Sequence, residues 1–466
     1  MKRILYDYFR CPEILGDFKL NGSLSQDKGF FRWGEDVLCY GRSTSGIRSG
    51  QVDRPLYDVS NEVILDSPDV SLPFDASEVV ENLLRERYSA HFREPGKLSH
   101  DAIRKIYYLL RPLLIMPVRK RLQKIHLRNW HEIPFPQWPV DCTVNRMHER
   151  LMALAMRAQG IEKLPFIWFW PKGMKSCFIL THDVEDNSGM DFCSKLMDLD
   201  QSFGFHSSFQ IVPEERYVVT QEFLRSIVER GFEVNVHDLK HDGRLYAELE
   251  KFKRGAKRIN QYARDFGASG FRSGILYRNA DWYDHFEFSY DMSIPNVGHL
   301  DPQRGGCCTV LPYFVGNIVE LPLTCTQDHT LFNILEDYSI DLWIRQIELI
   351  RQNHGLISLL VHPDYVIEQQ PQSTYRKILE HVASLRDYGG VWAARPREVA
   401  NWWRQRSQMR LTSENGFWAV DGPGREQAQV AFLRLDGESV TYSFDPEKVP
   451  VLSETGVELH RRAGVD

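Results

Sequence analysis

The stretch that decides the fold is residues 175–185, KSCFILTHDVE, in which a short apolar run ends abruptly in polar residues. A run of this length, bounded by polar residues, predicts a buried strand rather than an amphipathic helix. Helical spacing then extends to about Phe203, and the alternation returns in HSSFQIV (206–212) followed by TQEFLRSIVERG (220–231). A third strand, FEVNVHD (232–238), precedes a long predicted helix. Further strands are predicted at 268–273, 288–294, 317–324, 355–363 and 390–394.

Seven or eight such strand–helix repeats extend from about Phe166 to Arg397. Near-continuous apolar strands that alternate with amphipathic helices are typical of a parallel sheet whose outer face is covered by helices. This number of repeats within about 230 residues fits a barrel better than an open sheet. The sequence therefore predicts an α/β protein with a distorted (β/α)7-type TIM-like barrel over residues 161–408.

Two further regions flank the predicted barrel. Residues 1–160 begin with short alternating segments such as FFRWGEDVLCYG (30–41), which predict a β-rich part. Helical periodicity follows, over 76–92 and 143–160. Residues 409–466 contain two alternating segments joined by Asp-Gly, AQVAFLRL and ESVTYSF, which predict a small C-terminal β-hairpin appendage.

Composition excludes several classes of protein. The chain has 466 residues with 57 Lys and Arg against 63 Asp and Glu, a net charge of −6, so a strongly basic nucleic-acid binder is excluded and no nucleic-acid partner is expected. No apolar run reaches the roughly 18 residues of a membrane span. The N-terminus lacks a continuous apolar segment, and the eight cysteines include no CxxC pair. We therefore expect a cytoplasmic protein with reduced thiols and no cleaved signal peptide.

Polar residues follow the apolar run at strand after strand, and barrel enzymes carry their chemistry at the C-terminal ends of strands. Asp183 and Glu185 end the first strand, and because they are two residues apart they face the same side of it. The third strand ends in His237, with His241 four residues later. The remaining candidates at or near later strand ends are Arg272, Asp291 and His362.

The spacing of His237 and His241 indicates a metal site. One turn of helix would bring both imidazoles to one face, and a carboxylate from another strand would complete a set of two histidines and one acid. Such a set leaves positions open for water and substrate, as in catalytic rather than structural sites. The alternative is a chance spacing on a solvated helix, since the chain has 16 histidines. The acidic THDVED segment at a neighbouring strand end favours the metal.

The other candidates also have ordinary structural explanations. His362 can be a buried core histidine, Arg272 can pair with a surface acid, and Asp291 can cap the turn before Pro295. Each explanation is as good as the functional one for a single residue. The convergence of all these residues on one barrel rim favours the functional interpretation.

Five segments in this order, THDVE, HDLKH, GFRSG, YDMSIP and LLVHP, resemble the motifs of the polysaccharide deacetylase family, also called the NodB-homology or carbohydrate esterase family 4 proteins. The resemblance covers about residues 165–400 and implies an incomplete (β/α) barrel. It also implies one divalent metal ion, with zinc as the first expectation, bound by His237, His241 and a first-motif carboxylate. Such a metal activates water and polarises the acetamide carbonyl.

The resemblance further implies a catalytic role for each remaining motif residue. Asp183 would be the base that takes the water proton, and Arg272 would hold Asp183 by a charge-assisted hydrogen bond. His362 would be the acid that protonates the leaving amine. Asp291 would orient His362 or keep it protonated.

Two positions depart from the family pattern. Val184 stands where the commonest first motif has a second, metal-binding aspartate. Some members use Asp-x-Asp instead, and Glu185 then takes the place of the second acid. Asp183 remains an alternative ligand, and Asp186 is a less favoured substitute. Gly274 stands where the third motif usually has proline, which concerns the shape of the substrate groove.

The sequence around the motifs resembles a subgroup found with exopolysaccharide or O-antigen biosynthesis. This resemblance implies a metal-dependent carbohydrate N-deacetylase that acts on an N-acetylated sugar, carried as a sugar nucleotide or a lipid-linked glycan. Two alternatives stay open. The chain can be a catalytically inactive glycan-binding or scaffold protein of the same pathway, or a hydrolase of another C–N or ester bond on the same fold.

One stretch, residues 103–128, is strongly basic although the chain as a whole has a net negative charge. It holds eight Lys or Arg residues and no acid, with apolar residues between them. Basic amphipathic segments can lie on anionic membrane surfaces, which would make the protein membrane-peripheral. The alternative is a pair of packing helices, and we favour it because Pro112 and Pro117 interrupt any single long helix.

Overall fold

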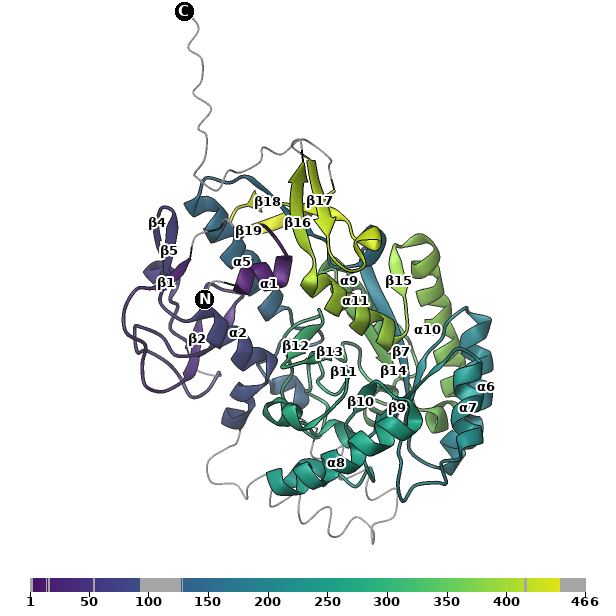
Figure 1. Ribbon diagram of the computed structural model, residues 1–466. Coiled ribbons are helices and arrows are strands. Elements are labelled where there is room, and N and C mark those ends of the chain that lie inside the picture. Colours follow the sequence, from purple (N-terminus) through teal and green to yellow (C-terminus); the bar gives the residue numbers. More distant parts are fainter. Residues whose placement is uncertain are drawn as a thin grey trace, which may run out of the picture.

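A computed structural model describes residues 3–444 of the chain, except 14, 16, 53, 54, 93–126, 128, 415 and 416. Its centre is a nine-stranded sheet in the order β12-β13-β11-β10-β9-β8-β7-β14, with β15 also paired to β7 (Figure 1). The strands are β7 (Ser176–Val184), β8 (Ser208–Ile211), β9 (Glu233–His237), β10 (Gly270–Arg272), β11 (Tyr290–Asp291), β12 (Tyr313–Val315), β13 (Ile318–Glu320), β14 (Leu356–Leu360) and β15 (Val391–Ala393).

All strand pairs in this sheet are parallel except β12 with β13. In the described part of the chain the sheet runs from β12 to β14 without closing, so the barrel is incomplete. Every residue of β7 is buried, as its continuous apolar sequence predicts. The predicted α/β class and the distorted barrel are confirmed.

Helices cover the outer face of the sheet. They are α6 (Asn187–Ser202), α7 (Gln221–Glu229), α8 (Leu249–Phe266), α9 (Asp341–Gln352), α10 (Gln369–Tyr388) and α11 (Pro396–Gln408). The apolar sides of α6, α7, α9 and α10 pack in one large core and that of α8 in a second, whereas α11 packs in a third core. α8 ends where Gly267 takes a positive φ of 65°, which glycine adopts without steric cost.

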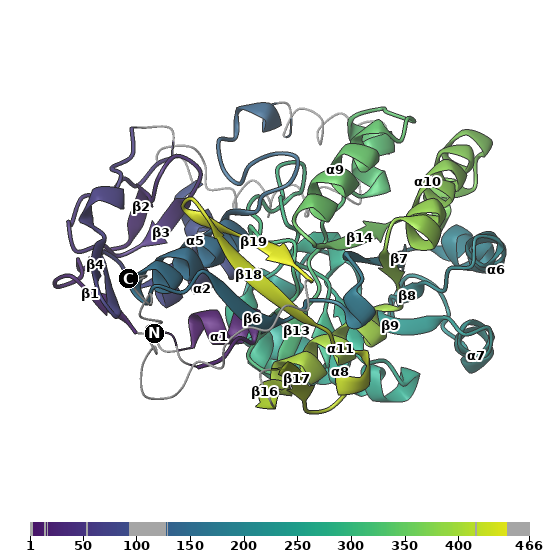
Figure 2. The same cartoon turned by 90° about the horizontal axis from the view of Figure 1, so that it is seen from above.

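The N-terminal region is β-rich and then helical, as predicted. It comprises α1 (Ile4–Phe9), β1 (Phe18–Leu20), β2 (Gly29–Arg32), β3 (Leu38–Gly41), β4 (Ile64–Asp66), β5 (Asp69–Leu72), α2 (Ala76–Leu84) and α5 (Thr143–Ala158). It lies at one side of the barrel in both views (Figures 1 and 2). Contact with the barrel includes a buried ion pair between Glu86 and Arg278, in which Arg278 Nε donates to Glu86 Oε2 at 2.7 Å.

The C-terminal part forms two hairpins, β16 (Arg410–Glu414) with β17 (Phe417–Asp421), and β18 (Val430–Asp436) with β19 (Ser439–Ser443). The second is the predicted hairpin. β18 also pairs with β6 (Lys163–Ile167), the strand that precedes the barrel. One hydrophobic core contains side chains from the N-terminal region, the barrel and these hairpins.

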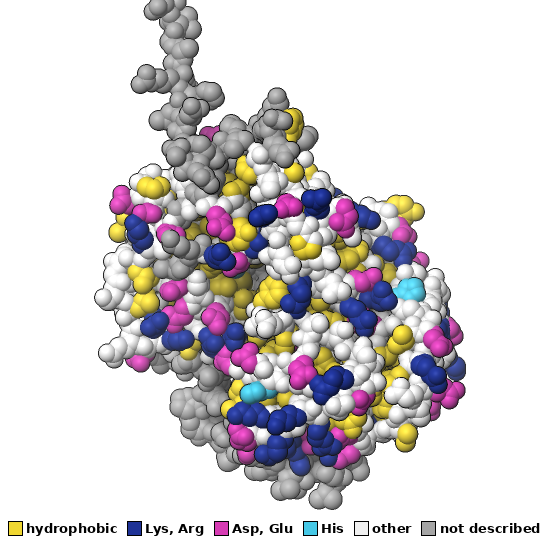
Figure 3. Space-filling model, viewed as in Figure 1, with side chains coloured by type: hydrophobic (Ala, Val, Ile, Leu, Met, Phe, Trp, Pro, Cys, Tyr) yellow, Lys and Arg dark blue, Asp and Glu magenta, His cyan; other side chains and the backbone are white. Residues whose placement is uncertain are grey.

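The charged side chains and the cysteines are distributed as in an ordinary globular protein. Acidic and basic side chains are interspersed on the face shown in Figure 3. All eight cysteines are free and buried. No described helix combines the length and the apolar character that crossing a membrane requires. The basic stretch 103–128 lies outside the described residues, apart from Leu127.

Candidate metal centre

The carboxyl ends of β7, β9, β10 and β14 lie at one edge of the curled sheet, and all the predicted site residues except Asp291 gather there. β14 pairs in register with β7 up to Leu360 opposite Thr181, so His362 emerges beside Asp183 and Glu185. Arg272 pairs with His237 at the ends of β10 and β9. The parallel arrangement alone therefore brings residues that are far apart in sequence to one place.

Three side chains at this edge form a candidate metal centre. Ligand atoms of Glu185, His237 and His241 all lie within 4.8 Å of one another. Glu185 Oε1 is 3.0 Å from His241 Nε2 and 3.8 Å from His237 Nε2. Both Nε2 atoms are buried, and neither has a hydrogen-bond partner among the described residues. Two buried, unpartnered imidazole nitrogens directed at one carboxylate fit a divalent cation such as zinc.

The protonation of this group also fits a metal. Burial raises the pKa of Glu185, but His241, His237 and His362 outweigh it and hold the pKa well below its usual range. The Glu185 carboxylate is therefore ionised at neutral pH. His237 Nδ1 lies 3.2 Å from the carbonyl oxygen of Arg272, which assigns the proton to Nδ1 and leaves the Nε2 lone pair for a metal.

The expected helical turn between His237 and His241 was wrong. Residues 238–241 form a loop in which Asp238 and His241 have positive φ angles of 54° and 52°. The Asp238 carboxylate accepts a hydrogen bond from Leu239 N at 2.7 Å, and such a local bond competes with helix formation. The loop still brings the two imidazole rings to 4.9 Å between centroids. Arg216 fixes its end by donating to the His241 carbonyl oxygen at 2.6 Å, and the same nitrogen lies 3.1 Å from His241 Nδ1.

Asp183 lies between the candidate metal ligands and Arg272. Its Oδ2 is 3.7 Å from His237 Nε2, and its Oδ1 is 3.6 Å from Arg272 Nε. Asp183 Oδ1 is buried and has no hydrogen-bond partner in the part of the chain that the structure describes, and Arg272 is fully buried. Arg272 Nη2 donates to Thr181 Oγ1 at 3.0 Å, which steadies the guanidinium. This position suits a base beside the metal, and it also suits a further ligand.

His362 is held by an aspartate that sequence reasoning missed. Asp328 is fully buried and accepts two hydrogen bonds from His362, from the backbone N at 2.7 Å and from Nδ1 at 2.6 Å. His362 Nε2 lies 3.4 Å from Glu185 Oε1. Burial lowers the pKa of His362, but Asp328 and Glu185 outweigh it and raise the pKa well above its usual value. The one sequence signal for Asp328 is its place shortly after the predicted strand 317–324.

Asp291 is the one predicted residue that the structure does not bring to this group. Its carboxylate accepts from Tyr283 Oη at 2.8 Å and from Ser293 N and Oγ at 2.9 Å. Ser293 Oγ in turn accepts from Ser273 N at 2.8 Å, so Asp291 steadies the chain next to Arg272. The contact with His362 that we expected of Asp291 is made by Asp328.

A second acid, Glu320, lies opposite Asp291 in the β11–β13 register. Burial and the charge of Asp291 raise the pKa of Glu320 well above its usual value. Near the site itself, burial raises the pKa of Asp364 to about 7. None of the described residues forms a hydrogen bond with the buried Asp364 Oδ1. Neither acid carried a sequence signal beyond its residue type.

Comparisons with known proteins give distant structural similarity. Neither a scan against models of known families nor a search of curated proteins finds a match. Among solved structures, the chain is similar to a protein provisionally described as a polysaccharide deacetylase from Mycobacterium smegmatis, with 19% identity, a TM-score of 0.39, and 51% of this chain and 93% of that one covered.

Two further solved structures show the same level of similarity. The Puue allantoinase has 11% identity and a TM-score of 0.39, with 50% of this chain and 92% of that one covered. The peptidoglycan deacetylase PdaC from Bacillus subtilis has 11% identity and a TM-score of 0.33, with 50% and 94% covered. The function of the chain therefore has to be inferred from its own residues and their geometry.

Proposed function

We propose that the chain is a metal-dependent hydrolase of the polysaccharide deacetylase family that removes N-acetyl groups from an acetamido sugar. The observation that carries the proposal is the pair of buried, unpartnered Nε2 atoms of His237 and His241 directed at Glu185. A base candidate, Asp183, and a proton donor candidate, His362, lie within 4 Å of the same group. The five ordered sequence motifs supply the family and the substrate class.

Glu185, His237 and His241 would bind the metal, with Asp183 as the alternative or additional carboxylate. A bound divalent cation such as zinc supplies an acidified water and polarises the acetamide carbonyl. A metal with one carboxylate and two imidazole ligands would have coordination positions left for the water and for the carbonyl oxygen. The ionised state of Glu185 favours a dication in this pocket.

The remaining residues would move the protons of the reaction. Asp183, held beside Arg272, would take the proton of the attacking water as a C–O bond forms at the acetyl carbon. His362, protonated at neutral pH, would give its Nε2 proton to the sugar nitrogen as the C–N bond breaks. The products are acetate and an amino sugar. Asp328 would keep Nε2 directed at the reacting atoms by accepting from Nδ1.

The proposed pathway and the form of the substrate rest on the sequence resemblance of the segments around the motifs. We propose a sugar nucleotide or a lipid-linked glycan of exopolysaccharide or O-antigen biosynthesis as the substrate. The alternative of an inactive scaffold protein is supported by Val184, which stands where the common family motif has a metal-binding aspartate. Glu185 offsets that loss, because its carboxylate lies one residue further along at the same strand end.

The test is acetate release from a panel of acetamido sugar nucleotides, lipid-linked oligosaccharides and matched O-acetyl sugars, with zinc, cobalt or manganese added. We expect release from at least one N-acetyl substrate and a fall of roughly two to four orders of magnitude for Asp183→Asn and for His362→Ala. Release from O-acetyl sugars alone would identify an esterase instead. Metal binding without release from any substrate would favour the scaffold alternative.

A further inference from the structure

A short segment of the loop between β8 and α7, residues 214–217, contacts the end of β7 and the loop after β9, which carry Glu185 and His241. Its sequence is Glu-Glu-Arg-Tyr, and it belongs to none of the five motifs that resemble the polysaccharide deacetylase family. Three of its four side chains are buried or half-buried, and the fourth, Glu215, is exposed. The segment therefore provides contacts behind the candidate metal centre.

Arg216 holds the end of the loop that carries His241. Its Nε donates to the carbonyl oxygen of Lys240 at 3.2 Å, and its Nη2 donates to the carbonyl oxygen of His241 at 2.6 Å. Nη2 also lies 3.1 Å from His241 Nδ1, whereas the other ring nitrogen, Nε2, lies 3.0 Å from Glu185 Oε1. The planar guanidinium thus contacts both the backbone and the ring of a candidate metal ligand.

The loop that Arg216 holds has little support of its own. Among the described residues, no backbone–backbone hydrogen bond involves residues 239–241. Leu239 N bonds only to the side chain of the preceding residue, Asp238. The positive φ angles at Asp238 and His241 are conformations that side chains rarely adopt, and they persist only where surrounding contacts impose them. The position of His241 therefore depends on contacts from another segment, and Arg216 supplies them.

Tyr217 holds the strand end that precedes Glu185. Its Oη donates to the carbonyl oxygen of Val184 at 2.7 Å and accepts from Val212 N at 2.9 Å, and its side chain is buried. Val184 is the last residue of β7, and Val212 follows the last residue of β8. One phenol therefore joins the ends of two strands at the residue before the candidate carboxylate ligand.

The two glutamates of the segment differ in their contribution. Glu214, whose side chain is 11% exposed, forms an ion pair with Arg258 of α8 and accepts from Tyr262 Oη at 3.1 Å. This contact fixes the segment to a long helix of the barrel. Glu215 forms an exposed ion pair with Lys240, and exposed pairs contribute little to the positions of their neighbours. Glu215 is therefore a natural control for the residue beside it.

We infer that Arg216 and Tyr217 form a bracket that positions two ligands of the metal, Arg216 acting on His241 and Tyr217 on Glu185. Side chains that orient the ligands of a metal commonly contribute about 10- to 100-fold to its affinity. The bracket rests on the proposed function only in that Glu185, His237 and His241 bind a metal. It is independent of the reaction and of the sugar.

The test is the zinc affinity of the full chain, measured by competition with a chromogenic zinc chelator. We expect Arg216→Gln to weaken zinc binding by about 10- to 100-fold. The loss of a positive charge would by itself strengthen the binding of a cation, so positioning and simple electrostatics predict opposite signs. Arg216→Lys should recover part of the affinity, because an ammonium can still donate to the His241 carbonyl oxygen.

Tyr217→Phe keeps the buried ring and removes only the hydroxyl, so it tests the bracket with little risk to the fold. We expect it to weaken zinc binding severalfold. Glu215→Gln is the matched control and should bind zinc as tightly as the wild type. Zinc affinities of Arg216→Gln and Tyr217→Phe that equal or exceed that of Glu215→Gln would overturn the bracket. A circular dichroism melt of each variant excludes loss of fold as the cause.

Failure of the bracket and failure of the proposed function give different results. Weakened zinc binding by Arg216→Gln and Tyr217→Phe, in a protein that releases no acetate from any substrate, would keep the bracket and reject the deacetylase. Acetate release by the wild type, with unchanged zinc affinity in both variants, would keep the deacetylase and reject the bracket. Absence of zinc binding by the wild type would overturn both.

Discussion

His362 can give a proton to a leaving group only while its ring is protonated and its Nε2 is exposed to the substrate. Asp328 provides both conditions, because it accepts from Nδ1 and its charge raises the pKa of the ring. Asp291 cannot do so from its position, since its carboxylate is engaged by Tyr283 and Ser293. Under the proposed function we therefore expect substitutions of Asp328 and Asp291 to have different effects on activity.

We predict that Asp328→Asn lowers turnover by roughly one to two orders of magnitude, within the range of general acid catalysis. The acid must be protonated, so activity falls as pH rises through the pKa of His362. Removing the Asp328 charge lowers that pKa and moves the alkaline limb of the pH–rate profile to lower pH. Asp291→Asn should leave this limb in place. If the alkaline limb fell at the same pH in the wild type and in Asp328→Asn, the role of Asp328 would be contradicted.

The proposed function also assigns different roles to Asp183 and Glu185, base and metal ligand. We predict that Glu185→Gln loses most of the zinc affinity, because an anionic ligand is replaced by a neutral amide. Asp183→Asn should retain close to one zinc per chain and lose turnover. Zinc content after dialysis, measured by atomic emission, separates the two. Loss of zinc from Asp183→Asn with full retention in Glu185→Gln would make Asp183 the third ligand.

At the scale of elements, the apolar runs predict the strands and the periodicity predicts the helices, because burial and side-chain spacing are local properties. The HDLKH loop could not be predicted in this way. Its four-residue histidine spacing suits a helix, yet a side-chain hydrogen bond at Asp238 stabilises a loop in which two residues have positive φ angles. Asp328 was missed because it lies beyond β13, at the start of a short helical segment, where residue type alone does not reveal a partner.

The contact between α5 and α1 makes the free energy of unfolding depend on pH. His148 of α5 stacks on Tyr8 of α1 at 4.0 Å between ring centroids, and burial lowers the pKa of His148 to about 4. The unfolded chain binds this proton near pH 6.5, so the stabilisation is complete above 6.5 and is lost as pH falls toward 4. We predict a loss of about 2 kcal/mol in the free energy of unfolding between pH 7 and pH 5 from this residue.

His148→Phe keeps an aromatic ring against Tyr8 and removes the titration. Urea unfolding at pH 7 and pH 5 should therefore show a smaller difference for this variant than for the wild type. An identical pH difference in both proteins would show that His148 does not contribute to the acid sensitivity.

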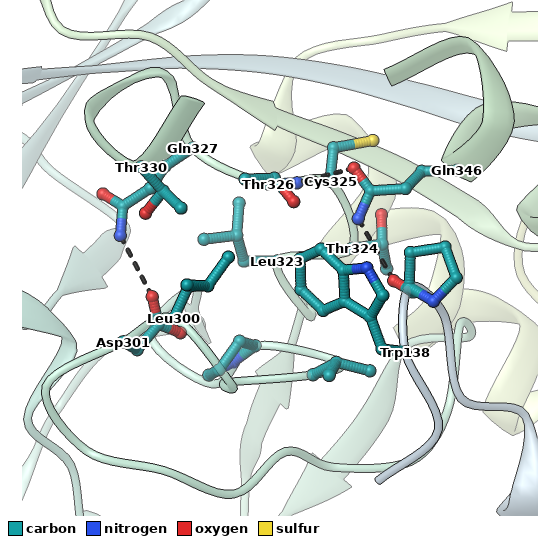
Figure 4. A pocket seen from close by; sticks show the side chains of 13 residues that line it. Trp138, Leu300, Asp301, Leu323, Thr324, Cys325, Thr326, Gln327, Thr330 and Gln346 are labelled. Atoms are coloured by element: carbon teal, nitrogen blue, oxygen red, sulfur yellow. Dashed lines mark hydrogen bonds between the residues drawn. The ribbon is translucent and has the colours of Figure 1, made fainter. Parts of the chain in front are cut away.

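At the scale of the whole molecule, contacts between distant segments decide how the flanking regions attach. β6 pairs with β18 across more than 260 residues, and Trp138 lines a small hollow together with Leu323 and Gln327 of the barrel (Figure 4). Sequence patterns predicted β18 and its hairpin partner, since the turn between them is local. The pairing with β6 and the place of Trp138 depend on how the whole chain packs, which periodicity does not encode.

Arg406 holds α11, α1 and the end of β6 together through hydrogen bonds. It is 2% exposed and donates to the carbonyl oxygens of Tyr8, Phe9, Ile167 and Trp168. Burial lowers its pKa to about 9, so it remains charged at neutral pH. We predict that Arg406→Met destabilises the protein by about 3 kcal/mol or more, because several buried carbonyls lose their donor.

The matched control for Arg406→Met is Arg425→Met, which removes an exposed ion pair with Asp421 and should change stability by less than about 1 kcal/mol. Chemical unfolding of both variants measures the difference. Equal stability of the two variants would show that Arg406 does not hold the segments together.

The central claim is that one metal ion at Glu185, His237 and His241 makes the barrel rim hydrolytic. The most direct measurement is acetate release by the stripped protein, on the best substrate of the panel, as zinc is added in steps. We predict a linear rise that levels off at about one zinc per chain, and no rise for the His237→Ala/His241→Ala variant. Full acetate release before any zinc is added, or an equal response of the double variant, would contradict the claim.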